Sequence, residues 1–577
     1  MASFPHSFRP RLLDALKAYS GRKFTADLSA GITVGLVALP LAMAFAIASG
    51  VKPESGIFTT IIAGFIISAL GGSRVQIGGP AGAFIVIIYG IIQQYGLANL
   101  LIATMMAGIL LFAMGITGVG SLVRYIPIGI VIGFTNGIAV LIGASQLKDF
   151  LGLKIAVMPA DFFSQVAVIA RSLSTVNVSA LALAAACLAI IIVWPRVTGM
   201  TPRGDGFAPS GRAALFSRLP ATVVALVLAT IAAIAFHLPV ETIGSRFGGI
   251  PQTLPAFALP ELHWQSARNL VGPTLTIALL GAIESLMCAR VADAMISDRH
   301  DPNQELMAQG IANFVTPLFG GLPATGTIAR TTVNIRSGAA SPVAGIVHAF
   351  TLLAVVLLAA PLAAYVPLAA LAAILLFVAW NMGEWKEFAR LRHFSMNYRI
   401  IMVSTFLLTV IFDLSIAVEI GLVLASLLFI FRVSALTRVD PIDLAPHEAA
   451  LDQKLAVRSS SLKGEDPHIV AYKLFGSVFF GAIGKVESLL DYNRERVSVV
   501  ILEMHQVINV DTTGLDTLEL LHRTLREEGR HLVLADVTAQ PLSLLRRSGF
   551  GRELGEDNIA ANLEQAIVRA RQLVVQK

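Results

Sequence analysis

Charged residues and cysteines are scarce in this chain, and their scarcity excludes two classes of protein. Only 14% of its 577 residues are charged and 55% are hydrophobic, whereas a soluble globular protein carries about 25% charged residues. The two cysteines, Cys187 and Cys288, both lie within apolar runs, so neither a disulfide scaffold nor a cysteine zinc cluster can be built from them. The composition therefore indicates a membrane protein.

Motifs of catalysis are also missing. The sequence contains no nucleophile elbow, no HExxH motif and no P-loop, so we predict no enzyme, no catalytic residue, no cofactor and no metal site. The net charge of +6 is modest and its basic residues gather in particular loops. That pattern favours membrane orientation over nucleic-acid binding. Residues 1–25 lack an apolar core followed by a cleavage site, which predicts a retained cytoplasmic arm instead of a signal peptide.

Apolar runs of membrane-spanning length recur from Leu28 to Ile430. A helix needs about 20 residues to cross a bilayer, so these runs predict an α-helical bundle embedded in lipid and not a barrel. We expect fourteen segments, two of them too short to span. They lie at residues 28–49, 54–71, 80–94, 97–115, 121–144, 176–195, 219–236, 271–290, 305–320, 327–337, 341–360, 366–382, 398–412 and 414–432.

The basic loops predict the orientation of the bundle. Counted from a cytoplasmic N-terminus, the loops Arg196 to Arg218, Arg290 to His300 and Lys386 to Arg399 all fall on one side, together with the exit after Phe431. The positive-inside rule therefore agrees with an even number of segments and with both termini in the cytoplasm, which we expect at a bacterial inner membrane.

Two short segments are interrupted by glycine and proline at equivalent places, seven segments apart. The third begins "QIGGPAGAF" and the tenth begins "GGLPATGTIARTT". Such a pair predicts two halves of seven segments related as inverted repeats, with a binding site between half-helices at the middle of the membrane. Free backbone N–H groups and the helix dipole make each half-helix N-terminus attractive to anions. Two proline-kinked packing helices are the alternative. The small residues that let a ligand reach the backbone are Gly79, Ala81, Gly82, Ala83, Ala324 and Gly326.

Two charged residues stand within apolar segments. Glu284 is flanked by leucine, alanine and isoleucine, and a carboxylate at such a place is costly unless it is paired, neutralised or facing water. We predict that it carries a proton; a hydrogen bond to a neighbouring backbone break is the alternative. Arg330 lies one turn into the tenth segment, where it either supports anion binding or extends to the cytoplasmic surface. His237 and His348 show no metal-ligand spacing, so we expect structural roles for both.

Beyond about Leu436 the sequence changes to alternating strands and helices. "HIVAYKLFGSV", "SVVILEMHQVINV" and "HLVLADV" predict strands, and the end of the chain predicts an amphipathic helix. We therefore expect four regions: an N-terminal arm at 1–25, a transmembrane domain at 26–436, a linker at 437–465 and a small cytoplasmic α/β domain at 466–577.

These features resemble the SulP anion transporters, a family that includes sulfate permeases and bicarbonate transporters. The matching stretches are "PESGIFTTIIAGFIISALGGSR", "NQELMAQGIANF", "GLPATGTIARTTVN" and, in the C-terminal domain, "DTTGLDTL", which is similar to the centre of a STAS domain. Ser55, Ile57 and Phe58 depart from the family signature. The resemblance implies a fourteen-segment fold of two inverted repeats, a core domain moving against a gate domain, and a homodimer. It also implies anion-binding positions at Gly79, Ala81, Gly82, Ala83, Phe84, Ala324, Thr325, Gly326, Thr327, Ile328 and Arg330.

The resemblance also guides the expected coupling ion. Sodium-coupled relatives have hydroxyl residues where this chain has Cys288 and Ala81, so the sequence favours protons, carried by Glu284. "LGAIESLMCA" and "VAWNMGE" are most similar to bacterial C4-dicarboxylate carriers. We expect a proton symporter of a dianion, either a C4-dicarboxylate such as succinate, fumarate or aspartate, or sulfate. A sodium-independent bicarbonate or chloride exchanger, or a channel-like anion conductor, is the alternative.

The loop "DTTG" of the STAS-like domain offers a regulatory site. In related signalling domains the second hydroxyl residue of this loop is phosphorylated, and here that residue is Thr513. Capping of the following helix is the alternative use of the same loop. A cytoplasmic protein that binds the domain is a further expected partner, beside the anion, protons and the lipid bilayer. We expect no nucleic-acid partner.

Overall fold

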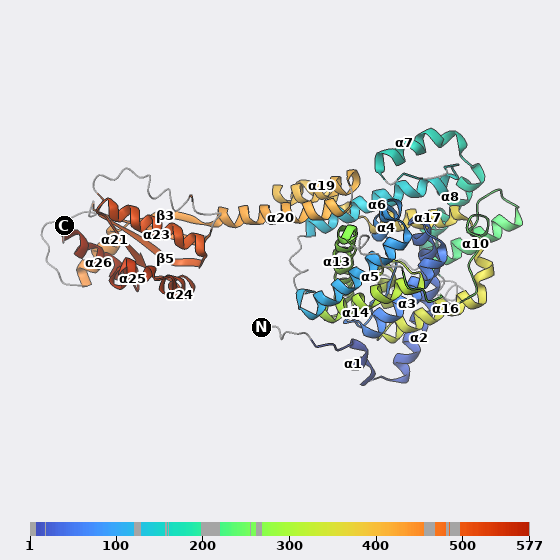
Figure 1. The fold of residues 1–577 in the computed structure, drawn as a ribbon, viewed down its shortest axis with the longest axis horizontal. Helices are drawn as coiled ribbons and strands as arrows, with labels where there is room; N and C mark the ends of the chain where they lie inside the picture. Colours follow the sequence, from blue (N-terminus) through green and yellow to red (C-terminus); the bar gives the residue numbers. More distant parts are fainter. Residues whose placement is uncertain are drawn as a thin grey trace. The chain divides into compact units, whose positions relative to one another are not determined.

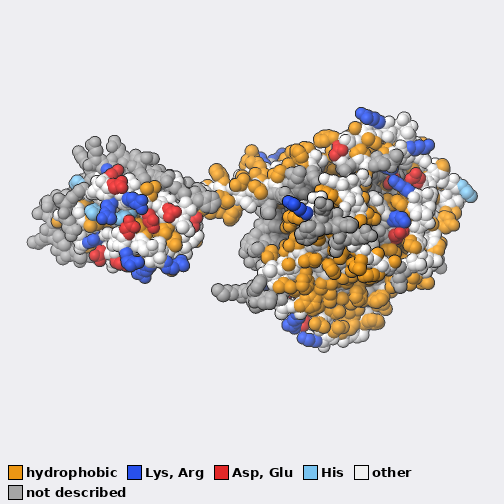
Figure 2. Space-filling model, in the orientation of Figure 1, with side chains coloured by type: hydrophobic (Ala, Val, Ile, Leu, Met, Phe, Trp, Pro, Cys, Tyr) orange, Lys and Arg blue, Asp and Glu red, His pale blue; other side chains and the backbone are white. Residues whose placement is uncertain are grey.

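The computed structural model describes residues 7–575 apart from short gaps. The gaps are residues 18, 121–127, 156–157, 160, 198–219, 254–255, 261–267, 413, 455–467, 480–483 and 485–496. The chain divides into two compact units, Met1–Leu422 and Val423–Lys577. Hydrophobic side chains cover much of the visible described surface of the first unit, whereas acidic and basic side chains are mixed on the second (Figure 2). The first unit thus has the surface of a protein that lies in lipid.

Each of the fourteen predicted segments corresponds to a described helix (Figure 1). Among the described residues, seven helices are long and apolar enough to cross a membrane: α2, α3, α5, α6, α8, α13 and α16. α4 and α15 are short, as the glycine and proline breaks predict. The fourteen helices are α2 (Gly21–Ala48), α3 (Pro53–Leu70), α4 (Phe84–Tyr95), α5 (Leu97–Ile116), α6 (Ile128–Leu151), α8 (Val178–Val197), α10 (Ala221–Ala235), α13 (Val271–Ile296), α14 (Pro302–Val315), α15 (Ile328–Arg336), α16 (Val343–Ala363), α17 (Leu368–Met382), α19 (Met396–Ile411) and α20 (Leu414–Leu436).

Shorter elements join these helices. The basic loop from Arg196 that helped to predict the orientation lies mostly at residues 198–219, outside the described part of the chain. The described connecting elements are α1 (Arg11–Lys17), α7 (Phe162–Ser172), α11 (Ile243–Phe247) and α18 (Trp385–Ala389), with the 3-10 turns η2 (Leu173–Thr175), η3 (Thr316–Phe319) and η4 (Leu391–His393).

The membrane helices form two packed groups, and each half of the sequence contributes to both. In the core bundle α2–α5 pack with α13–α16, and in the gate bundle α6, α8 and α10 pack with α17 and α19. Glycines allow the closest approach in the core bundle: a Cβ atom on Gly310 of α14 would lie 2.7 Å from the Gly108 carbonyl oxygen of α5. Close backbone contact of this kind drives helix association where lipid removes the hydrophobic driving force.

A two-stranded sheet with two residues in each strand connects the segments that lead into α4 and α15. Strand β1 (Gly78–Gly79) pairs antiparallel with β2 (Thr325–Gly326), so that Gly78 faces Gly326 and Gly79 faces Thr325. β1 precedes α4 and β2 precedes α15. Antiparallel strands leading into the two half-helices place the helix N-termini from the two halves of the chain beside each other, as the inverted repeat predicts.

The second unit contains a five-stranded sheet in the order β3-β4-β5-β6-β7. β3 pairs antiparallel with β4 and the remaining pairs are parallel. Val500 and Leu502 of β5 pack on the side of α23, whereas Val499 and Ile501 pack on the side of α26, as alternation along a strand requires. The elements are β3 (Arg438–Ile442), α21 (Ala445–Lys454), β4 (Ile469–Val478), β5 (Val499–Val510), α23 (Thr512–Glu527), β6 (His531–Ala535), α24 (Ala539–Ser548), α25 (Phe550–Leu554), η5 (Glu556–Asn558), β7 (Ile559–Ala560) and α26 (Leu563–Val575).

The segment expected to be a linker differs from the prediction. Residues 437–465 include β3, which pairs with β4 from Arg438 to Ile442, and also α21. Leu444 and Leu451 are buried in the core shared with α26. β3 is an edge strand with a proline, Pro441, a composition that suits edge strands but conceals them from periodicity. Residues 455–467 lie outside the described part.

Candidate functional site

Both half-helices begin without a side-chain cap. The residue before α4 is Ala83, which has no hydrogen-bonding side chain, and Thr327, the residue before α15, makes no capping bond. The Thr327 hydroxyl instead donates to the Ile77 carbonyl oxygen at 3.1 Å, and the Thr327 N–H donates to the same oxygen at 2.9 Å. At the start of α4 the Phe84 and Ile85 N–H groups donate to the Ala81 and Gly82 carbonyl oxygens of the preceding turn, each at 3.1 Å. No side-chain cap neutralises either helix start, so the positive end of each helix dipole attracts an anion.

The loop before β2 is held from three helices. Asn313 of α14 accepts from the Ala324 N–H and donates to the Ala324 carbonyl, both at 2.8 Å. The Leu322 N–H donates to the Thr59 hydroxyl of α3 at 2.6 Å, and the Thr325 hydroxyl donates to the Gly281 carbonyl of α13 at 2.9 Å. The backbone groups of Leu322 and Ala324 that a continuous helix would have bonded thus find side-chain partners on neighbouring helices. This pattern favours an ordered loop over a helix that is merely kinked at a proline.

Arg330 extends toward the start of the other half-helix. Its side chain is 1% exposed; Nη1 donates to the Thr60 hydroxyl and Nη2 to the Pro80 carbonyl, each at 3.4 Å. Nε has no partner, and no described carboxylate forms an ion pair with the guanidinium. Of the two positions that the sequence allowed for Arg330, the structure has the inner one: the side chain lies inside the protein and does not extend to the surface. A buried guanidinium with two long hydrogen bonds and no counter-charge is costly without an anion.

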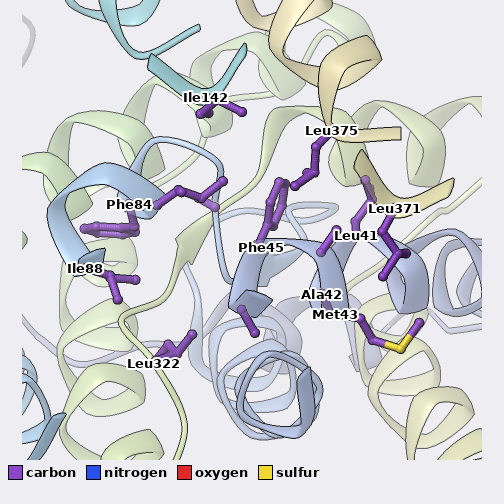
Figure 3. Close-up of a cluster of buried hydrophobic side chains, with 14 of the residues drawn as sticks. Leu41, Ala42, Met43, Phe45, Phe84, Ile88, Ile142, Leu322, Leu371 and Leu375 are labelled. Carbon is purple, nitrogen blue, oxygen red and sulfur yellow. The ribbon is translucent and has the colours of Figure 1, made fainter. Parts of the chain in front are cut away.

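The surroundings of α4 are apolar. A Cβ atom on Gly82 would lie 3.5 Å from the sulfur of Met382, and 3.7 Å from side-chain carbons of Ile142 and Phe45. Figure 3 shows Phe45 on α2, Phe84 on α4 and Ile142 on α6 in one cluster of buried hydrophobic side chains. This wall combines both bundles, since Met382 and Ile142 belong to the gate bundle and Phe45 to the core bundle.

Most of the predicted substrate-binding residues are brought together here. Ile328 differs, because its side chain is 47% exposed; only its backbone N–H, at the start of α15, has the geometry to serve an anion. The residues that lie buried at the two half-helix starts are Gly79, Ala81, Gly82, Ala83, Phe84, Ala324, Thr325, Gly326, Thr327 and Arg330.

Glu284 and Cys288 occupy successive turns of α13 in the core bundle. Glu284 is half-buried, and among the described residues no hydrogen bond or ion pair involves its carboxyl group. Cys288 is buried and donates to the Thr331 hydroxyl at 3.3 Å, which also accepts from the Ile77 N–H at 3.0 Å. Among the described residues, the carboxyl group of Glu284 therefore makes no hydrogen bond to the backbone of an interrupted segment, which was the alternative role for it.

Two further carboxylates escaped the sequence analysis. Glu305 of α14 is fully buried and accepts from the Gly72 N–H at 3.0 Å, the Gln309 amide at 2.9 Å and the Ser285 hydroxyl at 3.3 Å. Asp27 of α2 is equally buried and accepts from the Ala340 N–H at 2.7 Å. Glu305 belongs to the motif "NQELMAQG", one of the stretches that carry the family resemblance, and that motif was the available sign of its importance.

Asn334 of α15 and the "DTTG" loop both make hydrogen bonds with the backbone. Asn334 donates to the Val75 carbonyl at 2.8 Å. Asp511 caps α23 by accepting from the Gly514 N–H at 2.7 Å, so the capping role of the "DTTG" loop is present. Thr513 is half-buried in the first turn of α23, and its phosphorylation stays a prediction.

Comparison with known proteins places this geometry in context. The model of the Sulfate permease family matches residues 24–405, and that of the STAS domain matches residues 462–566. The Putative sulfate transporter YvdB of Bacillus subtilis is 42% identical over 551 residues, which cover 95% of this chain and 98% of that protein. The Bicarbonate transporter BicA of Synechocystis sp. is 30% identical over 558 residues, which cover 95% and 94%.

Solved structures share the fold. The transmembrane domain of a cyanobacterium bicarbonate transporter BicA is 31% identical, with a TM-score of 0.60 over 71% of this chain and 98% of that chain. The murine Solute Carrier 26 family member A9 anion transporter has a TM-score of 0.83 over 97% of this chain and 94% of that chain. At 17% identity the second likeness concerns the fold alone.

Proposed function

The chain belongs to the sulfate permease family, a family of anion transporters, and we propose that it carries a small dianion inward together with protons. The observation that supports this most strongly is Arg330, a buried guanidinium without a described carboxylate partner, directed at Pro80 before the start of α4. A dianion bound there would receive the guanidinium charge and the N-terminal N–H groups of both half-helices. It would thereby supply the counter-charge that the described residues do not.

Sulfate is the dianion that the surroundings favour. The wall near Gly82 is formed by Phe45, Ile142 and Met382, and none of these provides a second cation for the far carboxylate of a succinate-like ligand. A relative at 42% identity is named a sulfate transporter, which supports the same choice. Bicarbonate is the second candidate, because a relative at 30% identity is named a bicarbonate transporter. C4-dicarboxylates, suggested by local sequence resemblance, rank third.

Protons are the coupling ion in this proposal. Glu284 is half-buried in α13 without a described partner, so its carboxyl group is available to take up a proton from water. Cys288 and Ala81 lack the hydroxyl oxygens that a hard cation such as sodium prefers. Inward movement of a dianion opposes an inside-negative potential at a cost of about 2.3 kcal/mol per charge per 100 mV. Co-transported protons offset that cost.

The test is uptake of labelled sulfate by proteoliposomes under an imposed pH gradient. We expect uptake to saturate, to rise with an inward proton gradient, and to be reduced by unlabelled sulfate more strongly than by bicarbonate or succinate. Glu284→Gln should weaken the response to the gradient, whereas Glu556→Gln, a change at an exposed carboxylate, should retain it in full. Uptake that ignores pH in both variants and in the parent protein would overturn proton coupling. Chloride current without saturation would instead support the channel-like alternative.

The cellular setting is part of the same proposal. We place the protein in a bacterial inner membrane with both termini in the cytoplasm, because the basic loops Arg290 to His300 and Lys386 to Arg399 lie on one side of the predicted segments. A homodimer, and a cytoplasmic protein that binds the STAS domain, complete it. Protease treatment of sealed spheroplasts that cleaves residues 438–575 from outside would contradict the orientation.

A further inference from the structure

His348 of α16 is buried without a clear structural role. Its side chain is 0% exposed, and neither ring nitrogen has a hydrogen-bond partner among the described residues. Each unsatisfied buried polar group costs about 1–3 kcal/mol. An apolar side chain of similar size would pack at this place without that cost.

The imidazole lies beside the proposed anion site. Arg330 donates to the Thr60 hydroxyl of α3, and the His348 ring packs against Gly64, which is one turn further along the same face. A Cβ atom on Gly64 would lie 3.4 Å from Cε1 and 3.5 Å from Nδ1 of His348, and 3.2 Å from the Gly78 carbonyl of β1. Positions four residues apart on a helix are about 5–6 Å from each other. The guanidinium and the imidazole are therefore neighbours behind β1.

Few other ionisable groups face His348. α3 carries none between Thr60 and Ser68, and α2, which packs against α16 near Gly35, carries none between Gly31 and Ala38. The nearest on α2 is Asp27, two turns from Gly35, whose carboxylate accepts hydrogen bonds at the start of α16. Arg330 from α15 is thus the described charge that acts most directly on the imidazole.

We propose that His348 is a second proton-accepting group of the transport cycle, one that takes up a proton when the dianion binds beside Arg330. The inference rests on the proposed function. Without an anion, a second cation next to Arg330 is repelled; a bound dianion supplies the charge that reverses this repulsion. Linkage is reciprocal, so a protonated His348 also strengthens anion binding.

Two proton-accepting groups give a stoichiometry of two protons per dianion. One proton from the outer solution forms an N–H bond on the imidazole and a second protonates Glu284; both are released to the inner solution with the dianion. Two protons and one dianion carry no net charge. Transport by the parent protein is then electroneutral, and loss of either proton site leaves one uncompensated negative charge.

The experiment clamps the membrane potential of proteoliposomes containing the full chain, with potassium and valinomycin, at equal pH on both sides. Labelled sulfate is the probe. For the parent protein we expect the same final accumulation at zero and at 100 mV inside-negative. For His348→Gln we expect accumulation at 100 mV to fall about fiftyfold, the factor that corresponds to one charge. His393→Gln, a change at an exposed histidine, should behave as the parent protein does.

Three results would overturn the proposal. The first is a His348→Gln protein that remains insensitive to potential. The second is a parent protein whose accumulation already falls with potential; in that case anion transport stands but two-proton coupling does not. The third is absence of any dianion uptake, which removes the proposed function as well.

Proton uptake on sulfate binding tests the role of His348 without the His348→Gln variant, in case that variant does not fold. Sulfate is added to purified protein in weakly buffered detergent solution with a pH indicator. The parent protein should take up about two protons per sulfate bound, and Glu284→Gln, which retains His348, about one. Uptake of no proton by Glu284→Gln would contradict a role for His348.

Discussion

Half-helices α4 and α15 meet through paired strands of two residues each, yet the side chains around their first turns differ. α15 is surrounded by polar groups: Arg330 in its first turn, and Asn313 of α14, which holds the loop that leads to it. α4 is surrounded by Phe45, Ile142 and Met382. The repeated backbone supplies two similar dipoles, whereas the positive side-chain charge comes from one half. The two halves of such an anion site thus have similar backbones, but one is surrounded by polar and charged side chains and the other by apolar ones.

The largest effect is expected when the charge on the α15 side is removed. Arg330→Gln should lower the efficiency of sulfate transport about 100-fold, because hydrogen bonds from a charged donor are worth about 1.5–3 kcal/mol. The thermal stability of the anion-free protein should stay unchanged or rise, since an unpaired buried charge is lost. The measurements are proteoliposome uptake and thermal unfolding in detergent. A fall in stability with unchanged transport would assign Arg330 a structural role.

A smaller effect is expected from the backbone that connects the two halves. A Cβ atom on Gly79 would lie 2.2 Å from Nη1 of Arg330, and the φ angle of Gly79 is +154°. Gly79→Ala should therefore displace the guanidinium and weaken sulfate binding about tenfold, in line with about 1–3 kcal/mol of backbone strain. Gly90→Ala is the matched control, because a Cβ atom there meets no atom within 4 Å. Sulfate affinity is measured by calorimetry. Equal affinity of the Gly79→Ala and Gly90→Ala proteins would mean that Gly79 does not contribute to the anion site.

The smallest effect is expected on the apolar side. A Cβ atom on Gly82 would make only ordinary contacts, 3.5–3.7 Å from its neighbours, and the backbone N–H remains. We expect Gly82→Ala to change the concentration of sulfate at half-maximal uptake less than about threefold, in keeping with tolerated small substitutions. A tenfold increase would mean that the anion lies directly against Gly82, so that α4 contributes as much as α15 and the two halves are chemically alike.

Much of the core bundle follows from local sequence. Glycine and proline at 78–80 and 320–323 predict where α4 and α15 begin, because such residues interrupt a helix wherever they stand. The linker expected at 437–465 shows the opposite case. Pro441 conceals strand β3 from a period-two pattern, and only its partner in β4 identifies it.

The sequence by itself determined the fourteen segments, the two interrupted helices and the family, because hydropathy and helix-breaking residues act within a few positions of themselves. Only the tertiary structure decided that Arg330 turns inward to Pro80, that Glu305 and Asp27 are buried among hydrogen-bond donors, and that His348 lies behind β1. These outcomes depend on groups up to 314 residues away along the chain. Whether a buried charge finds a partner is set by how distant helices pack, which no local pattern records.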